Sequence, residues 1–139
     1  MTGTLHIGAL ARRSGRSVYT LRWYEREGLM PGVIRDNGGR RVYREDHLVW
    51  LEFLDRLRLT GMSVAEMRRY AELVLEGRAT LGDRRALLEL HRQRIVADIE
   101  DRRRALALVE AKIEYYRRWE AEGRRPERLP SLADIELDA

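Results

Sequence analysis

The longest stretch without a helix-breaking residue places the strongest limit on the fold of this chain. Between Asp83 and Glu122 the sequence contains neither proline nor glycine. Its apolar residues recur at spacings of seven, four, seven, three, four and three residues, which is typical of a heptad repeat. This series consists of Leu88, Ile95, Ile99, Leu106, Val109, Ile113 and Tyr116. We therefore predict a single helix from about Leu81 to Glu122.

An isolated helix of this length buries little apolar surface, so it requires a second surface to pack against. The simplest is the same helix of a second chain, in a parallel or antiparallel coiled coil; the alternative is a helix that folds back on its own domain. Arg92 and Arg102 interrupt the apolar seam. We expect a homodimer whose interface contains Leu88, Ile95, Ile99, Leu106, Val109 and Ile113.

Two short helices joined by a glycine are predicted near the N-terminus. Ile7 and Leu10, within residues 5–14, have the spacing of one helical face, and Gly15 breaks this helix. Ser17 can cap the second helix by accepting a hydrogen bond from a backbone N–H in its first turn. Two helices joined by such a turn form a helix-turn-helix, whose second helix enters the major groove of DNA.

The second helix has an apolar side and a polar side. Val18 and Leu21 are expected to face inward, and Gly28 ends the helix so that Leu29 packs back on it. The remaining sides carry aromatic and arginine side chains, which a helix that only packs against a core does not need. We therefore expect these side chains to contact DNA.

Residues 33–43 predict a β-hairpin. Two short apolar runs flank residues 36–39 (DNGG), a strong turn signal because Asn and Gly accept the positive φ of hairpin turns. Arg35, Arg40 and Arg41 lie beside this turn. A basic hairpin next to a helix-turn-helix is a wing, which can reach the minor groove or a row of phosphates.

Two more helices follow the hairpin. Residues 45–59 form the first of them, with either Leu51 or Val49, and either Phe53 or Leu54, on its inner face. A serine-capped helix that ends at a glycine comes next. Together these helices predict a second unit similar to a helix-turn-helix.

The chain is expected to have three parts. Residues 1–77 form a winged helix-turn-helix DNA-binding domain, residues 78–122 a coiled-coil dimerisation helix, and residues 123–139 a short tail that is a remnant of an effector region. A short docking segment within the tail is expected around Leu132, Ile135 and Leu137.

Charge is unevenly distributed between these parts. Residues 1–44 contain nine arginines and three acidic residues, whereas residues 61–139 contain 16 basic and 16 acidic residues. All of the net charge of +4 is therefore contributed by the first part of the chain. Such an asymmetry favours an anionic partner at the N-terminal end.

Composition excludes several kinds of site. The chain has no cysteine, which excludes disulfides and thiolate zinc sites, and its three histidines are far apart in sequence. We find no hydrolase-like nucleophile arrangement and no phosphate-binding glycine loop, so we expect no enzyme activity, no metal and no cofactor. With no apolar run of about 18 residues and no apolar signal segment, we expect a cytoplasmic protein without a membrane partner.

Three motifs in a fixed order point to a family. TLRWYEREGLMP is followed by NGGRRVYREDHL and then by LRLTGMSVAEM. Over residues 7–68 the chain resembles the DNA-binding domain of MerR-type transcription regulators. The resemblance implies a mainly α fold, in which a winged helix-turn-helix with a small β-hairpin wing precedes a long dimerisation helix. It also implies a homodimer joined by an antiparallel coiled coil, which distorts a palindromic promoter site and so acts indirectly on RNA polymerase.

The expected DNA-binding residues lie around the second helix and in the wing. They are Arg16, Ser17, Tyr19, Thr20, Arg22, Tyr24, Arg40, Arg41 and Tyr43. Two of them have a second interpretation. Arg22 could pair with Glu25 on a solvated helix face, and Tyr24 could belong partly to the core.

The effector is a separate question. Many members of the family that this chain resembles sense metals or oxidants through cysteines near the end of the long helix, and this chain has none. Tyr115, Tyr116 and Trp119, together with Tyr70, could form an aromatic pocket for an organic and cationic small-molecule effector. The alternative is that Tyr116 continues the seam and the other aromatic residues seal its end against the DNA-binding domain.

Two other functions compete with promoter regulation. The chain could be a small-molecule-sensing module with secondary DNA binding, or an architectural, excisionase-like protein that bends DNA. The long helix argues against the second of these, because such proteins are usually shorter.

Overall fold

The structure is a computed structural model that describes residues 3–135. Leu137, part of the predicted docking segment, lies outside the described residues. Contacts within the chain divide it into two compact units, Met1–His91 and Arg92–Ala139. The winged helix-turn-helix lies in the first unit.

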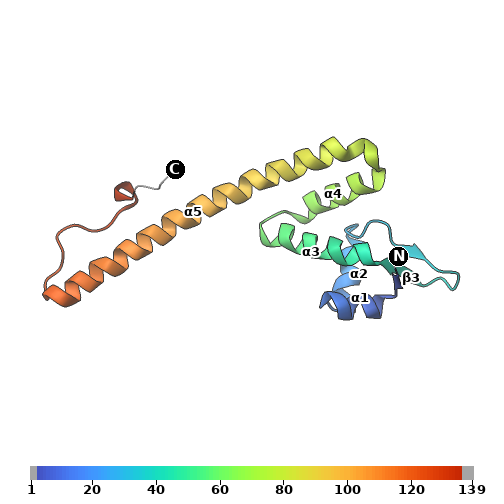
Figure 1. The fold of residues 1–139 in the computed structure, drawn as a ribbon, viewed down its shortest axis with the longest axis horizontal. Helices are drawn as coiled ribbons and strands as arrows, with labels where there is room; N and C mark the ends of the chain where they lie inside the picture. The colour runs from blue at the N-terminus through green and yellow to red at the C-terminus, as the bar shows by residue number, and fades with distance from the viewer. Residues whose placement is uncertain (1–2, 136–139) are drawn as a thin grey trace. The chain divides into compact units, whose positions relative to one another are not determined.

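Short helices and short strands make up most of the first unit (Figure 1). Its elements are β1 (Thr4–Leu5), α1 (Ile7–Ser14), α2 (Val18–Arg26), β2 (Ile34–Arg35), β3 (Arg41–Arg44), α3 (Glu45–Leu59) and α4 (Val64–Glu76). A turn of 3-10 helix, η1 (Arg78–Thr80), leads into α5 (Leu81–Glu122), and a second one, η2 (Leu132–Asp134), lies in the tail. The predicted fold class is confirmed: mainly α, with a small hairpin and one long helix.

The ends of α1 and α2 follow local rules of the chain. Gly15 ends α1 in the left-handed region at φ 71°, and the Ser17 hydroxyl accepts the Thr20 N–H at 3.0 Å to cap α2. Gly28, at φ 75°, ends α2, and the Leu29 N–H donates to a carbonyl of the last helical turn at 2.9 Å. These predicted boundaries are confirmed.

The core of the first unit lies between the helices and the central strand. Its buried side chains are Leu10, Leu21, Tyr24, Leu29, Met30, Tyr43, Leu51, Leu54, Leu57, Met62 and Met67. The two alternatives on α3 are thereby settled, because Leu51 and Leu54 are buried whereas Val49 is 67% and Phe53 37% exposed. Val49 and Phe53, one turn apart on another face of α3, therefore remain in contact with solvent.

A small antiparallel sheet supports the hairpin. The strand order is β1-β3-β2, so β3 is the central strand. Leu5 pairs with Tyr43 on one side, and Arg35 pairs with Arg41 on the other. Residue 5, predicted to begin the first helix, belongs instead to β1, because two residues are too few to give a strand pattern and the pairing with β3 decides their conformation.

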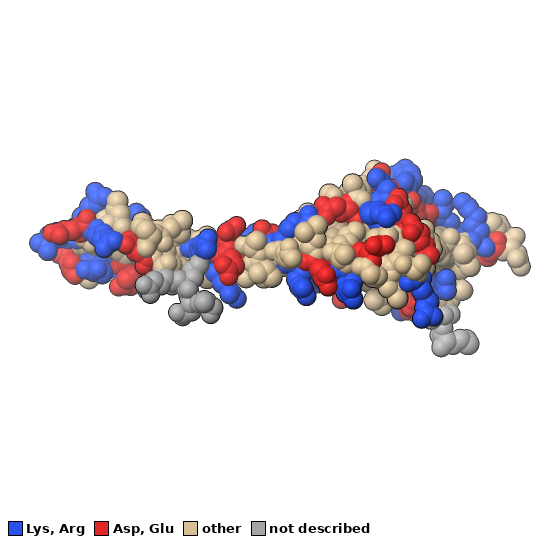
Figure 2. Space-filling view, turned by 90° about the horizontal axis from the view of Figure 1, so that it is seen from above, with Lys and Arg blue, Asp and Glu red and all other residues tan. Residues whose placement is uncertain are grey.

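The long helix α5 contains 42 residues and has the predicted bounds. Its first turns belong to the first unit, where Leu87 and Leu88 pack against the core. Farther along, the seam residues Leu106 and Val109 are 57% and 55% exposed. Acidic and basic side chains are interspersed over the surface drawn in Figure 2. Within the described residues, no helix is both long enough and apolar enough to cross a membrane.

Candidate nucleic-acid interface

The recognition helix α2 presents one buried side and one exposed side. Leu21 and Tyr24 are buried at 0% and 3% exposure, whereas Tyr19 is 74% exposed. Arg22 is also exposed and has no hydrogen bond or ion pair with any described residue. The helix therefore holds its apolar residues in the core and leaves an aromatic ring and a guanidinium available to an outside partner.

Thr20 and Ser17 form the polar start of this helix. Their hydroxyl oxygens lie 2.9 Å apart, in addition to the cap made by the Ser17 oxygen. Because this cap fixes the first turn, the neighbouring side chains project from a rigid backbone. Both residues are at least partly accessible to solvent.

Arg16 makes its contacts inside the first unit. Its guanidinium donates to the carbonyl of Ser14 at 3.0 Å and to that of Leu51 at 3.1 Å, and it pairs with Asp55. Its side chain is 13% exposed. Arg16 therefore ties the turn between α1 and α2 to α3, which sets the position of the recognition helix.

A carboxylate joins the recognition helix to the central strand. The Tyr43 hydroxyl donates to Oε1 of Glu25, and Arg41 forms an ion pair with Oε2 of the same side chain. Tyr43 is fully buried, and this burial raises the pKa of its hydroxyl, which the hydrogen bond to Glu25 raises further. Both oxygens of Glu25 therefore contact side chains of β3, and Glu25 does not pair with Arg22, three residues before it.

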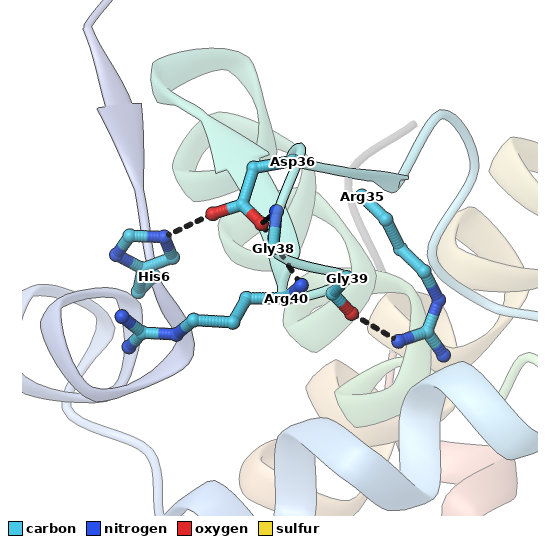
Figure 3. A network of polar contacts seen from close by, with 6 residues as sticks. All are labelled: His6, Arg35, Asp36, Gly38, Gly39 and Arg40. Carbon is cyan, nitrogen blue, oxygen red and sulfur yellow. Dashed lines mark hydrogen bonds and ion pairs between the residues drawn. The ribbon is translucent and has the colours of Figure 1, made fainter.

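The turn of the wing is closed by Asp36 (Figure 3). One oxygen of its carboxylate accepts the N–H groups of Gly38 at 3.0 Å and Arg40 at 2.9 Å. The Gly39 N–H donates to the Asp36 carbonyl at 3.0 Å, and the guanidinium of Arg35 donates to the Gly39 carbonyl at 2.7 Å. The hairpin predicted from DNGG is confirmed, although its positive φ of 81° belongs to Gly39 and not to the asparagine.

His6 connects the N-terminal segment to this turn. Its Nε2 lies 3.2 Å from Oδ2 of Asp36, the oxygen that the backbone of the turn leaves free. The pKa of Asp36 is lowered, first by the N–H of Arg40 and then by His6. An ionised carboxylate therefore organises the wing at neutral pH.

The arginines of the first unit fall into two groups. Arg13 donates to Glu45 at 2.7 Å, and Arg68 donates to Glu27 at the same distance, so both connect helices. A second group has exposed guanidinium groups without an ion pair to any described residue. On α1, α2 and the wing it includes Arg12, Arg22, Arg26 and Arg40. These four cations are available to a polyanion without breaking an internal contact.

The aromatic residues predicted to bind an effector have partners within their own units. Tyr70 of α4 stacks on Trp50 with ring centroids 5.4 Å apart and meets Phe53 edge-on at 6.0 Å. Burial raises the pKa of its hydroxyl. Tyr70 therefore helps to hold α4 against α3.

The second unit contains the other three aromatic residues. Tyr115 is buried, and Tyr116 and Trp119 are 48% and 38% exposed. Lys112 Nζ lies 5.0 Å from the ring centre of Tyr115, and Arg125 lies over Trp119 at 5.8 Å while donating to the Tyr115 hydroxyl at 2.8 Å. Cations of the same chain therefore already lie against these rings. No group of three or more His, Asp or Glu side chains within residues 3–135 could hold a metal ion.

A helix-turn-helix whose recognition helix lies beside a basic hairpin defines the class of winged helix-turn-helix DNA-binding proteins. Residues 5–73 match the family described as MerR HTH family regulatory protein. The chain belongs to the MerR family of DNA-binding transcription regulators, which are not enzymes.

Individual relatives extend this similarity into the long helix. The chain is 38% identical over 113 residues to an uncharacterised HTH-type transcriptional regulator of Haemophilus influenzae, covering 81% of this chain and 84% of that protein. It is 37% identical over 92 residues to the HTH-type transcriptional regulator AdhR of Bacillus subtilis, covering 66% of each. The crystal structure of HiNmlR, a MerR family regulator lacking the sensor domain, bound to promoter DNA, has a TM-score of 0.73 and 36% identity, covering 88% of this chain and 97% of that one.

For two residues that organise this surface, sequence reasoning missed the contacts that they make. Glu25 and Asp36 are the acidic side chains that hold the recognition helix to β3 and close the wing turn. A signal for both was present, because acidic residues are scarce in the basic residues 1–44. An acid retained within a DNA-binding motif is a candidate for an internal contact.

Proposed function

We propose that this protein is a homodimeric regulator that binds a palindromic promoter site and distorts the DNA, and thereby controls transcription by RNA polymerase. The observation that carries the proposal is that, within the first unit, the recognition helix and the wing each present an exposed arginine without an ion pair to any described residue, Arg22 and Arg40. The similarity to HiNmlR, which was crystallised on promoter DNA, supports it.

The proposed contact residues divide by exposure. Tyr19, Thr20, Arg22 and Arg40 are accessible, and we assign them direct contacts with bases or phosphates, with Ser17 at the helix start contacting the backbone. The other proposed residues position these contacts from within the fold. They are Arg16, Tyr24, Arg41 and Tyr43. Mutation of this second group should weaken binding through misplacement of the recognition helix or the wing.

Dimerisation is proposed to follow from the exposed seam of α5. Ile99, Leu106 and Ile113 are 44%, 57% and 46% exposed in the single chain. Apolar surface on this scale gains free energy when it is buried, at about 25 cal/mol per Å². We assign residues 1–77 to DNA binding, residues 78–122 to dimerisation, and the remaining tail to sealing the end of the long helix.

We infer that the aromatic cluster of the second unit seals the tail and does not form an effector pocket. Lys112 and Arg125 lie where a cationic ligand would have to lie. The chain also matches 97% of the crystallised chain of HiNmlR, a regulator described as lacking the sensor domain. An organic effector would have to displace both cations.

The proposal is tested by fluorescence anisotropy with a labelled duplex from upstream of its own gene and with a scrambled duplex, each across a salt series. We expect preference for the native duplex and a steep loss of affinity as salt rises. Equal and weak binding to the upstream duplex and to the scrambled duplex would contradict the proposal. Gel mobility of the protein bound to DNA fragments that carry the site at different positions would measure the bend.

A further inference from the structure

The recognition helix contains a single acidic residue. Within α2 (Val18–Arg26), Glu25 is the one carboxylate, on a helix whose Tyr19, Thr20 and Arg22 contact DNA under the proposed function. A negative charge at this place repels phosphates, so it requires a compensating role. Its side chain is only 13% exposed, although residues beside it on the helix are open to solvent.

Both oxygens of this carboxylate are used by the central strand. One accepts the hydroxyl of Tyr43, whose ring is fully buried and meets His47 edge-on at 5.7 Å. The other pairs with the guanidinium of Arg41, which lies opposite Arg35 at the start of the wing. Since β3 pairs with both β1 and β2, its position determines that of the whole hairpin.

We propose that Glu25 is a positioning residue that fixes the spacing between the recognition helix and the wing, and thereby sets the discrimination between operator and other DNA. The discrimination rests on the proposed function, whereas the spacing is a property of the free protein. The two DNA-contacting elements must meet the duplex in one relative placement for base contacts and phosphate contacts to form together. A carboxylate that binds a neutral hydroxyl and a cation at once provides that placement.

The charge of Glu25 has a second consequence. Its ion pair restrains Arg41 and offsets the positive charge of that guanidinium, which limits attraction to DNA of any sequence. Glu25→Gln retains the shape and an oxygen that can accept from Tyr43, but it releases Arg41. One additional phosphate contact would steepen the dependence of log affinity on log salt by about 0.9. Binding to scrambled DNA should therefore strengthen while preference for the operator falls.

The test combines a distance measurement with DNA binding. The chain has no cysteine, so Tyr19→Cys and Asn37→Cys introduce spin labels at unique places on α2 and at the wing turn. Labelled chains diluted into unlabelled protein give the distance distribution within one chain by pulsed EPR. We expect a narrow distribution in the otherwise unchanged protein and a broader one with Glu25→Gln. Glu45→Gln, which removes the same charge from the Arg13 pair on α3, should leave it narrow.

DNA binding without the labels supplies the second readout. We expect Glu25→Gln to reduce the ratio of operator to scrambled affinity roughly tenfold with a steeper salt dependence, and Glu45→Gln to leave the ratio unchanged. Tyr43→Phe, which keeps the buried ring and removes only the hydroxyl, should reduce the same ratio. This variant replaces Glu25→Gln in the test if Glu25→Gln does not fold. An unchanged distance distribution and an unchanged ratio in folded Glu25→Gln would overturn the proposal. Absence of any operator preference in the unmutated protein would instead contradict the proposed function. In that case the EPR distance distributions would still decide whether Glu25 fixes the spacing between the recognition helix and the wing.

Discussion

The two units of this chain differ in how far they bury similar apolar side chains. In the first unit, Leu21 and Leu51 are fully buried by neighbouring helices of the same chain. In the second, Ile113 and Val109 remain about half exposed on α5. A short chain can close a core around several short elements, whereas a single long helix cannot cover its own apolar seam. The first unit therefore closes its core within one chain, whereas the second leaves its apolar seam in contact with solvent.

The ion pairs differ in the same way. In the second unit, Arg117 lies 3.9 Å from Glu114, three residues before it on α5, and such exposed pairs contribute roughly 0.2–0.5 kcal/mol. In the first unit, the pair of Arg68 with Glu27 joins α4 to the end of α2. A pair within one helix adds only to helix stability, whereas a pair between elements also fixes their relative position.

The largest expected effect comes from opening the core of the first unit. Leu21→Ala removes a fully buried side chain of α2 and should lower the free energy of unfolding by about 2–5 kcal/mol. Urea denaturation followed by circular dichroism measures this loss. Val49→Ala, at a position 67% exposed, should change the same free energy by no more than about 0.5 kcal/mol. Similar losses in both variants would contradict the assignment of the core.

A charge in the seam should disrupt the proposed association of two chains through α5 without unfolding the first unit. Ile99→Glu places a carboxylate among the seam residues, and we expect association weakened roughly a hundredfold, or about 2.8 kcal/mol. Light scattering across a concentration series gives the association state. Val96→Glu is the matched control, since Val96 is 53% exposed on the same helix but lies outside the predicted seam. A dimer that survives Ile99→Glu would exclude the proposed interface.

The exposed side of α2 is tested by removing its unpaired guanidinium. Arg22→Ala should weaken specific DNA binding by about 1–3 kcal/mol if this side chain contacts a base. The effect on folding should be small, because Arg22 is exposed and makes no hydrogen bond or ion pair within residues 3–135. Anisotropy with the operator duplex measures the change. Arg85→Ala, on α5, should leave affinity nearly unchanged. Equal effects of the two substitutions would remove Arg22 from the base contacts.

The smallest expected effect is a local dependence on pH. The pKa of Asp36 lies below its ordinary value of 3.8, so its contribution to the wing is present above that pH and is lost as pH falls through the lowered pKa. Carboxyl carbon shifts in NMR should titrate below 3.8, and the amide signals of Gly38 and Arg40 should move with the same midpoint. In Asp36→Asn these amides should no longer follow that titration. A midpoint at or above the ordinary value would contradict the hydrogen-bonded turn.

Much of the fold could be predicted because its signals are local. Gly15 and Gly28 end helices through their own backbone conformation, and Ser17 begins one through its own hydroxyl. The hairpin turn and the bounds of the long helix were equally readable, because a turn signal and an unbroken heptad pattern depend on a few neighbouring residues. The motif order also identified the family. Where two residues competed for one face of α3, the periodicity alone left both choices open.

Burial and pairing between distant elements were decided only by the tertiary structure. The sequence by itself determined which segments are helical, where they end, and that the basic charge lies near the N-terminus. It did not determine that β1 would pair with β3, or that Arg16 would donate a hydrogen bond to the Leu51 carbonyl. Nor did it determine that Glu25 would contact side chains of β3 and not of its own helix. Helix ends depend on the conformations of adjacent residues, whereas the partner of a long polar side chain depends on which elements the core brings within hydrogen-bonding distance.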